Sequence, residues 1–323
     1  MLGTRYNIEP FYFSSSLGWI PSRYQSNTVS GVGDRSCLNL LSALSTDLFW
    51  RRLDITITLT FARTMRNTTT IPPGPNSSIR SAGTADKVAH EPQNKMIDTH
   101  APLLLQSNDV LIVPDLLALH MVRSEKENTI ISYHPGYNHG TTTAEALHRR
   151  FALTGRSVYW SSMFKETNDP TLLLLSLMWY PLYCWDEVFE TLYSHICFLV
   201  SLAILHNRSQ LTGSQESKVL ITNDTNLTHE LHAIRAHLLH YQALLDDFRK
   251  TVTFIEQTPF PGLNDPVQYP PHNREVSQQL LKSESANLLR EIQRLQDSKE
   301  LQERRLKNVM NLVCAYSFNV RRC

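Results

Sequence analysis

The sequence predicts a mixed fold of class α+β or α/β, in which a part with strands is followed by long antiparallel helices. Alternating polar and apolar residues, with β-branched Ile and Thr, predict a strand at 54–61. Two long segments with apolar residues at heptad spacing, 228–257 and 274–316, predict the helices. We therefore expect an α/β domain over 1–215 and a helical hairpin or stalk over 216–323.

The composition is that of a globular protein, and its overall charge does not indicate nucleic-acid binding. Of the 323 residues, 41% are hydrophobic and 19% are charged, which excludes disorder throughout the chain. Lys and Arg number 31 against 30 Asp and Glu, so positive charge is not in excess. The five cysteines are unclustered and odd in number, which suits reduced thiols in the cytoplasm.

Three strands are predicted before residue 140. The segment 54–61 is the clearest of them. A second strand is the short apolar block Val110 to Val113, which Pro114 is expected to end. A third is Thr129 to Tyr133, because the turn signal His-Pro-Gly at 134–136 follows it.

Two segments in the first 100 residues fit this domain poorly. Residues 67–100 are polar, rich in proline and without period, so we expect a disordered insertion there. Residues 36–52 are apolar at near-helical spacing but lie between a turn-rich approach and the first strand.

After residue 140 the sequence becomes helical. Residues 141–151 begin with threonines that can cap a helix, and Leu147 and Phe151 lie on one face. The aromatic stretch at 157–164 is compatible with a strand or with irregular structure.

The apolar run at 171–206 raises the question of a membrane span. Pro181 divides the run, and Asp186, Glu187 and Glu190 follow it directly. Each half is then too short to cross a bilayer, and each carboxylate would be costly there. We expect two buried core helices, the first of them capped by Asn168-Asp169-Pro170.

The two C-terminal helices are expected to pack on each other as an antiparallel pair. The seam of the first is unbroken, and it comprises Leu231, Ile234, Leu238, Tyr241, Leu245, Phe248, Val252 and Ile255. The seam of the second is interrupted by Lys299 and Gln302, which suits a helix that faces water or another subunit. In a monomer we therefore expect Leu306, Val309 and Val313 to form an exposed apolar stripe that favours oligomerisation.

No catalytic residue is predicted, and the metal ligands remain unknown. The histidine-rich segment 229–240 lacks the H-E-x-x-H zinc motif, because alanine occupies the position of the second histidine. His229 shares a helix face with His232, and His237 shares one with His240. This spacing is compatible with weak metal binding, and equally with a solvated polar face opposite the seam.

The other polar clusters do not form an enzyme signature. His134, His139, Glu145 and His148 gather near a turn, but the sequence contains no nucleophile elbow, Walker sequence or dinucleotide-binding glycine motif. We therefore expect a protein that is not an enzyme.

Two further groups of side chains allow a binding or a structural interpretation. The aromatic residues Trp160, Trp179, Tyr180, Tyr183 and Trp185 could stack on bases or sugars, but on such apolar helices we expect core positions. The basic residues Arg304, Arg305, Lys307, Arg321 and Arg322 could contact a membrane surface or form a solvated helix face.

Several segments resemble a known family. They are TTTAEALHRRFALTGRSVYWSSMFKETNDPTLLLLSLMWYPLYCWDEVFETLYSHI at 141–196, the pair of C-terminal helices, YNIEPFYF and SLGWIPSRYQ near the N-terminus, and KNVMNLV near residue 313. Together they resemble the cytosolic part of fungal CorA-like Mg²⁺ transporter proteins. The block WYPLYCWDEVFETLY is the most specific piece, and it is a signature of fold and family rather than of catalysis.

The resemblance implies a cytosolic α/β domain, a very long helix that descends into the membrane, and assembly as a pentameric funnel. It suggests Mg²⁺ as the ion, with family regulatory sites formed by acidic residues between protomers. The family's Gly-Met-Asn pore motif does not occur in this sequence. We therefore expect a non-transporting cytosolic or regulatory domain, located in the cytoplasm or at the cytoplasmic face of a membrane.

The expected partners are further copies of the chain or full-length family members, which would bind through the long helices. The alternative to a CorA-like domain is a soluble helical interaction protein with coiled-coil-like long helices.

Overall fold

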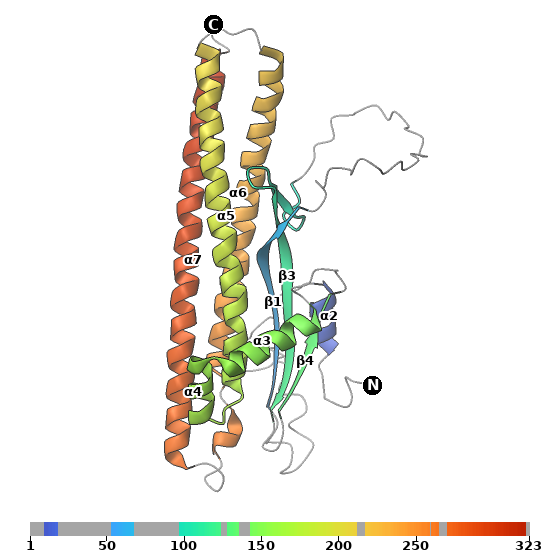
Figure 1. Cartoon of the computed structure of the whole chain (residues 1–323), viewed down its shortest axis with the longest axis vertical. Coiled ribbons are helices and arrows are strands. Elements are labelled where there is room, and N and C mark those ends of the chain that lie inside the picture. Colours follow the sequence, from blue (N-terminus) through green and yellow to red (C-terminus); the bar gives the residue numbers. More distant parts are fainter. Residues whose placement is uncertain are drawn as a thin grey trace, which may run out of the picture.

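The computed structural model describes residues 10–18, 53–67, 97–123, 128–135, 143–211, 217–258, 260–264 and 270–320. Within these ranges the fold is mixed α+β, with a small antiparallel sheet packed against long helices that lie side by side (Figure 1). The segment 36–52 and nearly all of the predicted insertion at 67–100 lie outside the described residues.

The sheet is built around its long central strand. This strand, β3 (Val110–Arg123), pairs antiparallel with β1 (Leu53–Arg66) along its whole length. Its other edge pairs with β2 (Leu103–Leu105) near its start and with β4 (Thr129–Tyr133) near its end. The strands predicted at 54–61 and 129–133 are therefore confirmed.

The predicted end of the second strand at Pro114 was wrong, because β3 continues to Arg123. On the β1 side Pro114 lies opposite Ala62. On the other edge, the described strands pair only with residues 110–112 and 118–122. Pro114 falls in the gap between them, where the missing N–H of a proline removes no ladder hydrogen bond from that edge.

Different helices pack on the two faces of the sheet. Odd-numbered residues of β1, such as Ile55, Ile57 and Leu59, join the main hydrophobic core with the long helices. On the opposite face, Tyr12 of α2 (Pro10–Gly18) packs on Leu116 and Ala118. The period-2 pattern of the strand therefore places its β-branched apolar side chains against the helices.

Two short helices follow the sheet, α3 (Ala144–Arg156) and α4 (Val158–Glu166). The Thr143 hydroxyl caps α3 by accepting a hydrogen bond from the Ala146 N–H across 3.2 Å, as the sequence predicted. The aromatic stretch at 157–164 is helical, neither a strand nor irregular.

The apolar run forms one helix, α5 (Thr171–Leu211), and the prediction of two helices was wrong. Pro181 lies inside it and is buried. Proline removes one hydrogen bond of a helix, at a cost of about 3 kcal/mol. Burial of neighbours such as Leu182 and Trp185 in the core offsets this cost.

The last two helices form the predicted antiparallel pair (Figure 1). They are α6 (Ser217–Glu256) and α7 (Pro271–Val320), with the short 3₁₀ turn η3 (Pro261–Asn264) between them. Gln296 of α7 bonds Asp246 of α6, and Gln293, one turn earlier in α7, bonds Arg249 further along α6. Partner numbers that fall on one helix as they rise on the other indicate an antiparallel register.

The expected exposed stripe on α7 was wrong. Leu306, Val309 and Val313 are buried, as are Lys299 and Gln302. The reason is the continuity of α5, which runs beside both α6 and α7 and makes a three-helix bundle where we expected a hairpin (Figure 1). The third helix covers the seam that a pair would leave open.

An arginine ties the lower end of the bundle to the sheet. Arg123, at the end of β3, is fully buried, and its Nη1 donates to Thr171 Oγ1 at 2.8 Å and to the Thr258 carbonyl at 2.7 Å. Asp169 accepts a hydrogen bond from the Thr171 N–H, which is the predicted cap of α5. The start of α5 and the end of α6 are thereby fixed to the same strand end.

Candidate functional site

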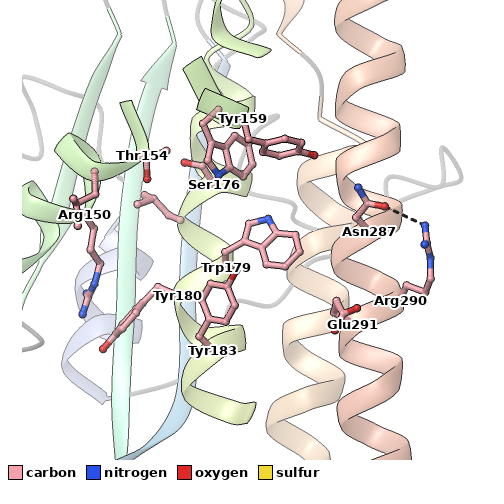
Figure 2. Close-up of a pocket in the computed structure, with 13 residues that line it drawn as sticks. Arg150, Thr154, Tyr159, Ser176, Trp179, Tyr180, Tyr183, Asn287, Arg290 and Glu291 are labelled. Atoms are coloured by element: carbon pink, nitrogen blue, oxygen red, sulfur yellow. Dashed lines mark hydrogen bonds between the residues drawn. The ribbon is translucent and has the colours of Figure 1, made fainter. Parts of the chain in front are cut away.

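A pocket of about 610 Å³ opens between α3, α4, α5 and α7 (Figure 2). Its lining is mainly aromatic, with two arginines and one carboxylate among the polar groups. It comprises Arg150, Leu153, Thr154, Tyr159, Trp160, Ser176, Leu177, Trp179, Tyr180, Tyr183, Asn287, Arg290 and Glu291. Its volume lies within the usual range of small-molecule sites.

A buried carboxylate beside this pocket joins side chains of α4, α5 and α7. Glu284 of α7 is only 1% exposed. It accepts hydrogen bonds from the Tyr159 hydroxyl at 2.6 Å, Trp179 Nε1 at 3.0 Å and Asn287 Nδ2 at 3.2 Å. Because its charge is met by three donors, Glu284 fixes the orientation of Tyr159 and Trp179.

The two arginines of the pocket are held differently. The Arg150 guanidinium lies over the Tyr180 ring, 3.2 Å from its centroid. Arg290 is exposed, and its Nη2 donates to Asn287 Oδ1 at 3.1 Å (Figure 2). Glu291 pairs with Arg294, and 2.7 Å separate Glu291 Oε2 from Arg294 Nε. The pocket therefore presents two guanidinium groups, while its one carboxylate, Glu291, is already paired with Arg294.

The prediction that the aromatic residues are core is correct for Trp185, which is fully buried, and in part for Trp179 and Tyr180, which are half-buried against the main core. Trp160 and Tyr183 are not core residues, and together with Trp179 and Tyr180 they line the pocket. Helical spacing carries a signal for this difference. Ser176, Trp179, Tyr180 and Tyr183 recur on one face of α5, whereas the core residues of α5 lie on another.

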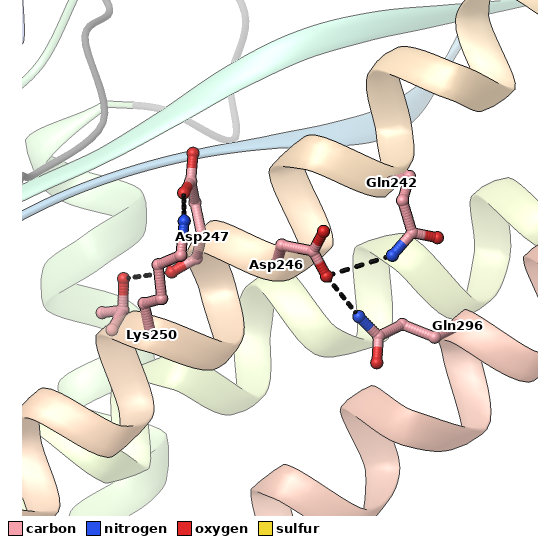
Figure 3. A network of polar contacts seen from close by, with 6 residues as sticks. Gln242, Asp246, Asp247, Lys250 and Gln296 are labelled. Atoms are coloured by element: carbon pink, nitrogen blue, oxygen red, sulfur yellow. Dashed lines mark hydrogen bonds and ion pairs between the residues drawn. The ribbon is translucent and has the colours of Figure 1, made fainter.

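A second polar site lies between α6 and α7, where Gln242 and Asp246 are half-buried (Figure 3). Asp246 Oδ1 accepts hydrogen bonds from Gln242 Nε2 at 3.0 Å and from Gln296 Nε2 at 2.7 Å. The neighbouring Asp247 instead pairs with Lys250, whose Nζ lies 3.0 Å from Asp247 Oδ1. The Lys250 side chain is mostly exposed. Of the two aspartates, Asp246 bonds a side chain of α7 and Asp247 bonds one of its own helix.

His195 of α5 connects three elements. Its Nδ1 lies 2.8 Å from Ser107 Oγ in the β2–β3 turn, and its Nε2 lies 2.8 Å from Glu230 Oε1 on α6. The order serine, histidine, carboxylate is that of a proton relay. The His195 side chain is 0% exposed, however, and the arrangement serves to hold the turn against α5 and α6.

The histidine-rich segment of α6 does not form one solvated face. His229 and His232 are exposed, but His237 is buried and His240 half-buried. The His240 ring lies 4.8 Å from the ring of His100. Within the described ranges, no three His, Cys, Asp or Glu side chains are placed to hold a metal ion together.

The remaining predicted groups are dispersed. His134 lies 2.9 Å from Ser132 Oγ, while Glu145 and His148 are exposed on α3. His139 lies outside the described residues, as do Arg321 and Arg322.

Two of the basic residues that the sequence singled out on α7, Arg304 and Arg305, have partners on the bundle, and Lys307 is exposed. Arg304 pairs with Glu300, and the Arg305 guanidinium lies over the Tyr193 ring of α5, 4.4 Å from its centroid.

An apolar surface that the sequence analysis missed lies on the outer side of α5. We call it the α5 stripe, and its exposed members are Phe198, Leu202 and Leu205. Phe198, Leu202 and Leu205 follow one another at helical spacing. Among the described residues, one segment is long and apolar enough to cross a membrane, Thr171–Leu205, with a mean hydropathy of 1.8.

Comparisons with known proteins identify no relative of this chain. No family model, no curated protein and no solved structure matches it.

Proposed function

We propose that this chain is a cytosolic assembly or regulatory domain of the CorA-like magnesium transporter family and does not itself carry ions. Its element order supports this proposal, since the sheet precedes three long helices and the last of them is the longest. The family resemblance implies such a stalk below an α/β domain. At 1.5 Å per residue, the 50 residues of α7 extend about 75 Å.

The observation that carries the proposed assembly is the α5 stripe. Its side chains face water beside a bundle whose other apolar seams are buried. Exposed apolar side chains that follow one another along a helix mark an interaction surface. We propose that the occupant is a second copy of the chain, or a full-length family member with an equivalent helix.

Sedimentation equilibrium tests this assembly. We expect the wild-type chain to self-associate and the variant with Phe198→Ser and Leu202→Ser to sediment as a monomer. Each apolar side chain removed from an interface costs about 1.5–3 kcal/mol, so association should weaken by at least about a hundredfold. Val158→Ser is the matched control, because Val158 is 89% exposed but lies on α4. A variant that associates like the wild type would contradict the assigned surface.

The second candidate is a soluble helical interaction protein, which the same stripe also favours. The two functions differ in their response to metal, because the family resemblance suggests acidic Mg²⁺ sites between protomers. If association depended on apolar contacts alone, its dissociation constant would not change with the Mg²⁺ concentration. The proposed location is the cytoplasm, or the cytoplasmic face of a membrane in assembly with full-length family members.

A further inference from the structure

The aromatic pocket has the lining of a ligand site, and the proposed assembly does not account for it. Tyr159 and Trp160 enter it from α4, and Trp179 and Tyr183 enter it from α5 (Figure 2). The Trp179 and Tyr183 rings lie 5.9 Å apart between centroids, tilted by 36°. Aromatic walls of this kind favour a planar ring that can stack on them.

These walls are held in place before any ligand binds. The hydrogen bonds to Glu284 fix Tyr159 on one side and Trp179 on the other. A pocket whose rings are already oriented loses little conformational entropy on binding, which favours affinity.

The free charge in the pocket is positive. Glu284 is matched by three hydrogen-bond donors, and Glu291 pairs with Arg294. Across the described residues, neither Arg150 nor Arg290 forms a direct ion pair with a carboxylate. The charge of Arg150 does act on the buried Asp115, since burial raises the pKa of Asp115 and the charges of Arg63 and Arg150 oppose that shift. Arg150 lies face-on to Tyr180, which leaves the edge of its guanidinium free to donate to an anion.

We propose that this pocket binds a planar aromatic anion of about mononucleotide size. The ring would lie between the aromatic side chains of α4 and α5, and the phosphate or carboxylate would bind the Arg150 guanidinium. Arg290, at the α7 side of the opening, attracts the anion without fixing its position. This inference stands independently of the proposed assembly, because it uses a different surface.

Isothermal titration calorimetry on the full chain tests the inference with four probes. AMP supplies a ring with a phosphate, and indole-3-acetate supplies a ring with a carboxylate. Adenosine and inorganic phosphate supply the ring and the anion separately. We expect AMP or indole-3-acetate to bind with a dissociation constant below about 1 mM, and adenosine and phosphate to bind at least about tenfold more weakly.

Three variants assign the binding to this pocket. Arg150→Gln should weaken binding by about tenfold or more, since it removes a charged hydrogen bond. Tyr183→Ala should weaken it similarly through lost stacking, and Tyr183 is exposed, so the variant should fold. Arg304→Gln, on the same helix as Arg290 but outside the pocket, should leave binding unchanged.

Three results would overturn the inference. One is the absence of binding by both AMP and indole-3-acetate up to about 1 mM. Another is adenosine binding as tightly as AMP, which would remove the anion from the proposal. The third is an Arg150→Gln variant that folds and binds the probe with wild-type affinity. If Arg150→Gln does not fold, wild-type affinity in Tyr183→Ala overturns the inference instead.

Discussion

The Tyr159 hydroxyl on α4 donates a hydrogen bond to the Glu284 carboxylate on α7, with 2.6 Å between the oxygen atoms. Loss of solvent and the neighbouring carboxylate raise the pKa of Tyr159 to about 12. The hydroxyl therefore remains a donor throughout the physiological pH range. This contact joins a short helix of the N-terminal part to the long last helix.

Replacing the shared acceptor should destabilise the protein more than replacing one donor. Glu284→Ala leaves Tyr159, Trp179 and Asn287 without their acceptor, and we expect the free energy of unfolding to fall by about 3 kcal/mol. Tyr159→Phe should cost about 1 kcal/mol. Urea denaturation measures both. Glu300→Ala, which breaks an exposed pair with Arg304, is the control, and an equal loss there would refute the role given to Glu284.

Two adjacent aspartates on α6 should behave differently. Asp246→Ala removes the contact to Gln296 on α7, and we expect a loss of about 1–2 kcal/mol in the free energy of unfolding. Asp247→Ala removes only the pair with the exposed Lys250, so the loss should be below about 0.5 kcal/mol. Equal effects in thermal denaturation would show that the Asp246–Gln296 contact does not join the helices.

Acid should destabilise the fold through His237. Burial, with smaller contributions from His240 and His100, lowers the pKa of His237 to about 4, while Asp98 opposes the shift. An unfolded histidine titrates near 6.5, so the unfolded chain binds the proton first as the pH falls. The free energy of unfolding should then drop by up to about 3 kcal/mol between pH 7 and pH 4.

The variant His237→Gln should remove this part of the pH dependence. His232→Gln is the matched control, because His232 lies on the same helix but is exposed. Denaturant midpoints at pH 7 and pH 4.5 provide the comparison. The assignment to His237 fails when its variant loses as much stability on acidification as the control does.

A charge in the centre of the bundle should unfold the protein. Leu174 of α5 is 0% exposed, and Leu174→Asp places an unpaired carboxylate in the core at a cost of several kcal/mol. That cost is comparable with a domain's whole stability of about 5–15 kcal/mol. Leu153→Asp, at an exposed position on α3, should leave the circular dichroism melting curve nearly unchanged. A cooperative melt near the wild-type temperature in Leu174→Asp would contradict its burial.

Local patterns predicted the elements whose own sequence determines them. The alternation at 54–61 indicated β1, and the heptads indicated α6 and α7 in their antiparallel arrangement. The failures occurred at Pro114 and Pro181, where a local rule predicted an end. Pro114 is tolerated inside β3 because it falls in a gap between the paired segments of that strand. Pro181 is tolerated inside α5 because burial of neighbouring side chains offsets the cost of the lost helix hydrogen bond.

The site could not be predicted in the same way, because it depends on which helices meet. The sequence analysis paired α7 with α6 alone, so the polar interruption at Lys299 and Gln302 led us to expect an exposed stripe of Leu306, Val309 and Val313. In the bundle those residues are covered, and the stripe lies on α5 instead. The aromatic pocket needs side chains from four helices, and the spacing along α5 indicates only the aromatic face that this one helix contributes.

We propose that this chain is an assembly domain of the CorA-like family, and its response to Mg²⁺ tests that claim. Sedimentation equilibrium of the wild-type chain should be measured in excess Mg²⁺ and again after chelation with EDTA, at constant ionic strength. We predict a discrete oligomer that Mg²⁺ stabilises and chelation weakens. A chain that stays monomeric in both conditions, or an oligomer unaffected by Mg²⁺, would contradict the claim.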